Sequence, residues 1–133
     1  MDNGRKINCS CGCSKENTVL LYSCSGAADV GEIADRIVRK LRQDGRGKMT
    51  CLAGIGADLT GFIESAKGTN QNITIDGCQV ACAKKTLERI GVTPISYILT
   101  DMGLTKGITP VSDEIILEMS EKIKQKRLNP VAS

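Results

Sequence analysis

Short apolar runs alternate with amphipathic segments along most of this chain, and that alternation limits the folds it can adopt. The runs lie at residues 18–23, 48–53, 73–75 and 95–99. They are short and nearly continuous, which suits strands buried on both faces of a parallel sheet. The order therefore predicts an α/β fold: a single domain with a four-stranded, mostly parallel sheet and helices on both faces. This is a flavodoxin-like or Rossmann-like arrangement, for which 2-1-3-4 is the simplest strand order.

Helix signals follow each apolar run. The first helix is expected from Asp29 to near Gly45, because Asp29 and Glu32 match a capping box and the glycine can end the helix. Further helices are expected at residues 57–66, at 79–90 with Gly91 just beyond, and from Pro110 to just before Asn129. Apolar stripes of helical period support the first and last of them: Val30, Ile33, Ala34, Ile37, Val38 and Leu41, then Ile115, Ile116, Met119 and Ile123.

Composition narrows the chemistry that is open to the chain. Aromatic residues make up 2% of it, which argues against base stacking and hence against nucleic-acid binding. No histidine is present, so Ser-His-Asp catalysis, Cys-His catalysis and every histidine metal ligand are excluded. The sequence contains neither an apolar run of membrane-spanning length nor a signal peptide. A cytoplasmic location, where thiols stay reduced, is therefore expected.

Residues 1–17 are predicted to be a flexible, cysteine-containing tail, and residues 18–133 to form the metal-binding α/β domain. The tail carries Cys9, Cys11 and Cys13 in a Cys-x-Cys-x-Cys pattern. Three such thiols can capture or exchange a soft metal such as Cu(I) or Zn²⁺, or add ligands to a site in the domain. A tail whose cysteines serve no site is the alternative.

Four more cysteines, Cys24, Cys51, Cys78 and Cys82, stand at the junctions between predicted elements. The first three are 27 residues apart, close to the length of a strand, a helix and two turns in a βαβ unit of ~30 residues. A parallel sheet brings the carboxyl ends of its strands to one edge, where α/β proteins place their sites. Cys82 follows Cys78 by four residues and is expected on the same helical face. The pattern predicts a metal site of four thiolates, most simply for Zn²⁺.

Other interpretations of these cysteines stay open. Each can be a small buried hydrophobe. The same four thiols can instead belong to a redox protein, where they hold an iron–sulfur cluster or carry out thiol or persulfide chemistry. A closed sulfur tetrahedron leaves no open coordination position, so an enzyme is not favoured, and action on a small anionic ligand has only fold-level analogy behind it. The expected partners are the metal ion and a protein for metal or sulfur transfer, with no nucleic acid and no membrane.

Weaker signals have simpler explanations. Gly54-x-Gly56 matches the start of a dinucleotide-binding loop, but Leu59 occupies the position of the third glycine. Residues 25–28 can offer backbone N–H groups to an anion, or simply form a tight turn. The basic stretch 36–48 is a solvated helix face or a docking patch for an acidic partner. Asp76 is expected to fix a turn through side-chain-to-backbone hydrogen bonds.

Taken together, the cysteine-containing segments resemble a known family. The segments are Ser23-Cys24-Ser25-Gly26, residues 51–56, Ile75-Asp76-Gly77-Cys78 and residues 82–85. They are similar to the DGC-domain family, which is named after its Asp-Gly-Cys triplet, and the resemblance runs from Val19 to the last helix. It implies a small zinc-binding protein with four characteristic cysteines, which correspond here to Cys24, Cys51, Cys78 and Cys82. The resemblance implies no particular activity, and sensing, storage and transfer of metal all remain open.

Overall fold

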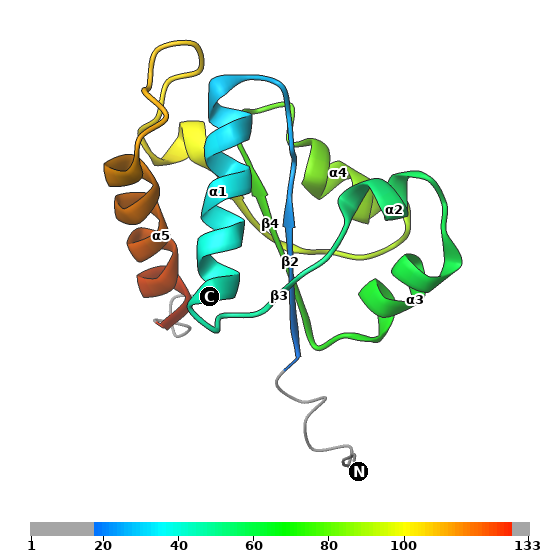
Figure 1. Ribbon diagram of the computed structural model, residues 1–133. Coiled ribbons are helices and arrows are strands. Elements are labelled where there is room, and N and C mark those ends of the chain that lie inside the picture. The colour runs from blue at the N-terminus through cyan, green and yellow to red at the C-terminus, as the bar shows by residue number, and fades with distance from the viewer. Residues whose placement is uncertain (1–17, 129–133) are drawn as a thin grey trace.

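Four parallel strands form the middle layer of the structure, a computed structural model that describes residues 18–128 (Figure 1). The strands are β2 (Val19–Ser23), β3 (Lys48–Met49), β4 (Gln71–Asp76) and β5 (Ile95–Ile98). Their spatial order is β3-β2-β4-β5, which in chain order is the expected 2-1-3-4 arrangement. The α/β fold and its parallel sheet are therefore confirmed. The predicted tail, residues 1–17, and residues 129–133 lie outside the described part of the chain.

Helices cover both faces of the sheet, as the sequence predicted. On one face lie α1 (Asp29–Gln43) and α5 (Asp113–Leu128). On the other face lie α2 (Leu52–Gly56), α3 (Thr60–Gly68) and α4 (Cys82–Arg89). A short 3₁₀ helix, η2 (Leu99–Met102), follows β5. None of the helices in the described range is long and apolar enough to cross a membrane.

Side chains that alternate along the strands supply a separate apolar core to each layer. Leu21 of β2 packs with the first layer, whereas Leu20 and Tyr22 pack with the second. The apolar stripe of α1 is buried as predicted: Val30, Ile33, Ala34, Ile37, Val38 and Leu41. Two ion pairs also join α1 to α5: Arg36 with Asp113 at 3.0 Å, and Lys124 with Asp44 at 2.6 Å.

The second predicted strand is wrong in extent. β3 pairs only with Leu20 and Leu21, and one further backbone bond runs from the Thr50 N–H to the Leu21 carbonyl at 3.0 Å. The chain then turns, so that Cys51 immediately precedes α2. The helix expected at residues 57–66 is α3, which begins later, at Thr60, and ends at Gly68. A short helix that was not predicted, α2, precedes it, and Asp58, with a positive φ of 66°, lies between the two.

The starts of two more helices differ from the prediction. α4 begins at Cys82 instead of residue 79, after Ala81 with a φ of 55°, and α5 begins at Asp113 instead of Pro110. The predicted capping box at Asp29 is also wrong. Ala28 is the N-cap of α1, and Asp29 Oδ1 instead accepts hydrogen bonds from the backbone N–H groups of Val30 at 2.7 Å and Gly107 at 3.0 Å.

The first turn of α1 packs directly on the end of β4. A Cβ atom built on Gly77 would stand 2.6 Å from the carbonyl carbon and oxygen of Val30. Gly31 is equally tight, since its Cβ would meet the Gly26 carbonyl oxygen at 2.5 Å. Only residues without a side chain allow two backbones to approach this closely. The glycine of the Asp-Gly-Cys triplet is therefore required by packing.

The Gly77→Ala variant is predicted to lower the free energy of unfolding by about 1–3 kcal/mol, because the methyl group pushes α1 away from β4. Gly61→Ala is the matched control: Gly61 lies inside α3 with nothing within 4 Å of its Cβ position. That control is expected to be neutral or to stabilise by up to ~1 kcal/mol. Urea unfolding of both variants tests this, and a Gly77→Ala protein as stable as the wild type would contradict it.

A buried tyrosine links β2 to β4 on the second face. The Tyr22 hydroxyl donates a hydrogen bond to Asn72 Oδ1 at 2.6 Å, and Asn72 Nδ2 donates to the Ala66 carbonyl at 2.9 Å. Burial disfavours the phenolate, so desolvation raises the pKa of Tyr22 from 10.0 to about 12. Because this pKa is raised in the folded state, the unfolded chain loses its phenolic proton first.

Stability is therefore predicted to be unaffected by Tyr22 below about pH 10, and to fall between pH 10 and 12 by at most ~3 kcal/mol from this residue. Unfolding free energies of the wild type and a Tyr22→Phe variant, measured across this range, isolate the effect. The variant removes the titrating group, so the difference in stability between the two proteins should narrow as the pH rises. A difference that stays constant would argue against the raised pKa.

Candidate functional site

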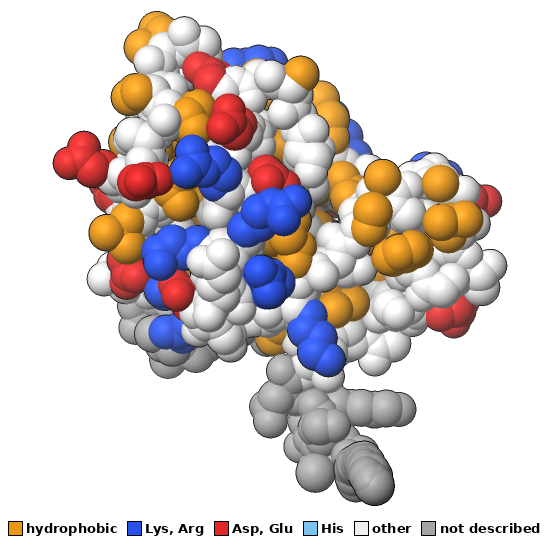
Figure 2. Space-filling view, viewed as in Figure 1, with side chains coloured by type: hydrophobic (Ala, Val, Ile, Leu, Met, Phe, Trp, Pro, Cys, Tyr) orange, Lys and Arg blue, Asp and Glu red, His pale blue; other side chains and the backbone are white. Residues whose placement is uncertain are grey.

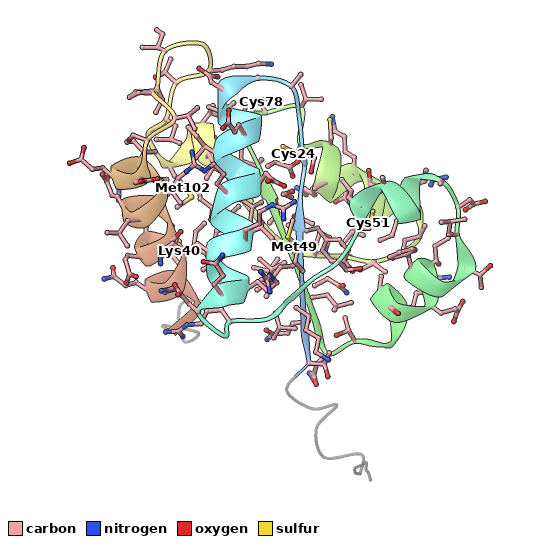
Figure 3. All side chains as sticks on the ribbon, in the orientation of Figure 1. Cys24, Lys40, Met49, Cys51, Cys78 and Met102 are labelled. Atoms are coloured by element: carbon pink, nitrogen blue, oxygen red, sulfur yellow. The ribbon has the colours of Figure 1, made fainter. Side chains whose placement is uncertain are left out.

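The four domain cysteines all lie at the carboxyl edge of the sheet. Cys24 follows β2, Cys78 lies two residues after β4, Cys51 immediately precedes α2, and Cys82 is the first residue of α4. Figure 3 shows Cys78 near the start of α1, Cys24 between α1 and α4, and Cys51 apart from both, beside α2. The chain reverses its direction of winding between β2 and β4, the position at which open α/β sheets form their crevices.

Two cavities divide these cysteines between them. The smaller, of about 300 Å³, is lined by Cys24, Cys78 and Cys82, together with Asp76 and Lys106. The larger, of about 760 Å³, is lined by Cys24 and Cys51. Cys24 thus belongs to both walls. Within residues 18–128, however, no three Cys, Asp or Glu side chains stand close enough together to form a metal-binding group as they are placed here.

Cys24 occupies the centre of this edge. Its backbone N–H donates to the Ile75 carbonyl at 3.1 Å, which extends the pairing of β2 with β4 by one residue. Its Sγ accepts a hydrogen bond from the Gly77 N–H at 3.4 Å. Burial raises the pKa of the Cys24 thiol, and backbone hydrogen bonds from Gly26 and Gly77 partly offset that rise. Any cation that binds this sulfur must therefore displace a proton that the folded protein holds more tightly than usual.

Cys78 has a basic neighbour, Lys106, that the sequence analysis did not predict. The Lys106 Nζ lies 3.7 Å from Cys78 Sγ and donates a hydrogen bond to it. The adjoining Gly107 N–H donates to Asp29 at the start of α1, which holds this part of the loop before α5 against the cysteines. Lys106 is 28 residues from Cys78 and stands in a Gly- and Thr-containing loop, so no local pattern connects the two.

Asp76 organises the segment between Cys78 and Cys82. Its carboxylate accepts hydrogen bonds from the backbone N–H groups of Ala83 at 2.7 Å and Lys84 at 3.1 Å, in the first turn of α4. The expected side-chain-to-backbone role of Asp76 is confirmed, although it acts on the helix start beyond the turn. Burial raises the pKa of this carboxyl, and the two N–H donors partly counteract the rise.

Cys78 and Cys82 do not share a helical face, contrary to the expectation from their spacing. Residues 78–81 form a turn, closed by a hydrogen bond from the Ala81 N–H to the Cys78 carbonyl at 3.0 Å. The left-handed conformation of Ala81 then starts α4 at Cys82. The turn nevertheless keeps both residues on the wall of the smaller cavity.

The partial dinucleotide motif has a packing explanation. Gly54 and Gly56 lie inside α2 and not in a loop. A Cβ atom on Gly54 would meet the ring of Phe62 at 2.5 Å, so the glycine allows α2 and α3 to pack closely. The structure therefore gives no support for a nucleotide site at this position.

The four cysteine sulfurs suit a soft metal ion, although they do not stand close enough together to form a metal-binding group. The four residues offer only sulfur, which thiophilic ions such as Zn²⁺ prefer. The Gly77 N–H and the Lys106 ammonium point at two of the sulfurs and would offset negative charge on thiolates. Cys51 and Cys82 are exposed, whereas Cys24 and Cys78 are half-buried. Closure around an ion would require the four cysteines to move toward one another.

Comparison with known proteins identifies a matching family and a similar protein. The family model of the DGC domain matches residues 20–125. A protein of Pseudomonas aeruginosa, the anaerobic and virulence modulator AnvM, is 32% identical over 88 residues, which cover 65% of this chain and 67% of that relative. No solved structure is a significant match. The match over most of the described residues, including the Asp76-Gly77-Cys78 triplet, shows that this chain belongs to the DGC domain family.

Proposed function

We propose that this protein binds a thiophilic metal ion, Zn²⁺ in the first instance, through Cys24, Cys51, Cys78 and Cys82. The observation that carries the proposal is the position of Cys24 on the common wall of the two cavities. From there its sulfur is the one that can join Cys51 on one side to Cys78 and Cys82 on the other. A bound zinc ion would supply positive charge that holds the separate sulfurs together.

Charge around the sulfurs supports this proposal. Two half-buried thiols, Cys24 and Cys78, each receive a hydrogen bond from a nitrogen donor, the Gly77 N–H and the Lys106 ammonium. Cys82 is the first residue of α4 and lies on the same cavity wall as these two thiols. A set of four sulfurs closes the coordination sphere, so binding, and not hydrolysis, is the chemistry it serves.

The exposure of Cys51 and Cys82 favours a metal that can be exchanged over a purely structural one. Sensing, storage or transfer of the ion is the corresponding cellular role, with a metal- or sulfur-exchanging protein as partner. The similar protein of Pseudomonas aeruginosa is named as a modulator, and a thiol site that gains or loses an ion can serve regulation. An iron–sulfur cluster is the alternative occupant, since it uses the same ligands.

The purified protein is predicted to hold one Zn²⁺ per domain. Cys24→Ser or Cys78→Ser is predicted to weaken the zinc affinity at least about a hundredfold, because losing a ligand reduces metal affinity no less than losing a group that supports a ligand. The tail thiols are first removed by Cys9→Ser, Cys11→Ser and Cys13→Ser. Competition with a zinc chelator measures the affinity. Co²⁺ uptake into the metal-free protein adds a visible spectrum that reports tetrahedral sulfur coordination.

Met49→Leu is the matched control. It removes a sulfur from the wall shared with Cys51 but no thiolate, and it conserves volume, so zinc affinity should not change. A brown protein that contains iron and sulfide after anaerobic purification would favour the cluster. The metal proposal is lost if the native protein contains no stoichiometric metal and the metal-free protein takes up neither Zn²⁺ nor Co²⁺.

A further inference from the structure

The larger cavity has the dimensions of a small-molecule site. Its volume is about 760 Å³, within the range of ligand pockets. The ends of β2 and β3 form one wall, α2 and Phe62 of α3 form another, and Thr86 of α4 and Arg39 of α1 complete it. β3 has only two residues, so this edge of the sheet is short, and Arg39 reaches the cavity from the helix layer on the opposite face.

Arg39 gives this cavity a cationic group, and its side chain is 58% exposed, on a surface where Lys and Arg side chains gather over α1 (Figure 2). Among the described residues of the lining, it is the one with a full charge at neutral pH. Its Nε donates to Asp35 Oδ2 at 2.8 Å, and Ser23 Oγ donates to Asp35 Oδ1 at 3.3 Å. Ser23 Oγ also lies 2.9 Å from Ser25 Oγ, and both serines line the cavity. A guanidinium has five N–H donors, and the bond to Asp35 uses one, so its planar fork can still recognise a carboxylate.

The lining of the larger cavity also contains thiols and apolar side chains. Cys51 is exposed and lies on the wall beside Met49 and Leu52, whereas Cys24 is half-buried. Apolar surface of this kind suits the methylene group that carries sulfur in a small thiol. Cys82 is also exposed, but it lines the other cavity. Of the two exposed thiols within residues 18–128, therefore, only Cys51 shares a cavity with Arg39.

We propose that the larger cavity binds a low-molecular-weight disulfide that carries carboxylates, with Arg39 on a carboxylate and Cys51 as the exchanging thiol. The Cys51 thiolate attacks one sulfur of the bound disulfide. A new S–S bond joins Cys51 to half of the ligand, the original S–S bond breaks, and the other half leaves as a thiolate. The ligand is thereby reduced and Cys51 oxidised, with no further reactant. This inference uses the metal-free protein, so it does not depend on the proposed metal site.

Oxidised glutathione is the probe, applied to the full chain after reduction, removal of metal and replacement of the three tail cysteines by serine. Mass spectrometry of peptides measures the rate of mixed-disulfide formation at each cysteine. Cys51 is expected to react faster than Cys82. Arg39→Gln should slow the reaction at Cys51 about threefold to fivefold, the effect of one partly exposed charge contact. Arg39→Lys should retain part of the rate.

The experiment has two controls: a disulfide without carboxylates, and the substitution of another arginine of α1, Arg42. Bis(2-hydroxyethyl) disulfide carries no carboxylate, so Arg39→Gln should leave its rate at Cys51 unchanged. Arg42→Gln removes an exposed charge from the same helix but not from the cavity, and should alter neither reaction. The proposal is overturned if Cys82 reacts with oxidised glutathione as fast as Cys51, or if Arg39→Gln slows both disulfides equally or slows neither. None of these results bears on zinc affinity, so the two proposals fail separately.

Discussion

The close contact between the first turn of α1 and the end of β4 is the constraint on which the site depends. Gly77 allows backbone to approach backbone there, and Gly31 allows a second close approach to Gly26 in the turn before α1, with no room for a Cβ on either residue. Since Gly77 also donates its N–H to Cys24 Sγ, the same contact fixes the central sulfur. The Asp-Gly-Cys triplet thus combines three tasks in consecutive residues: helix capping by Asp76, close packing by Gly77, and a thiol at Cys78.

At this edge of the sheet, burial and the nearby Asp76 carboxylate disfavour a thiolate at Cys24 as long as no cation is bound. The Asp76 carboxyl is buried next to three thiols, and its negative charge adds to the effect of burial in raising the pKa of Cys24. The protonated thiol is therefore favoured at Cys24 in the free protein, and placing further thiolates beside it would concentrate negative charge. A divalent cation reverses that cost by removing the protons and neutralising the sulfurs. The Lys106 ammonium contributes in the same sense but as a single, exposed charge.

The sequence predicted the parallel sheet and the edge that carries the cysteines, because buried parallel strands have an apolar pattern that local reasoning detects. The strand order that the structure has is the simplest one for this fold, but the sequence did not determine it. The sequence also did not predict the break at Asp58, the left-handed Ala81 or the start of α4 at Cys82. Those features place ordinary residues in conformations that their side chains do not favour, so tertiary packing decides them. Arg39 and Lys106 were missed for a related reason: each reaches a cavity from an element distant in sequence.

Cys51 takes part in both proposals, so the two proposed occupants are interdependent. A metal held by four sulfurs would engage the Cys51 sulfur, whereas a mixed disulfide at Cys51 would remove that sulfur from any coordination sphere. Each event therefore weakens the other, and thermodynamic linkage makes the antagonism between binding equilibria reciprocal. A protein built in this way would retain metal when small thiols are reduced and release it when they are oxidised. The division of four cysteines between two adjoining cavities is the structural basis for that coupling.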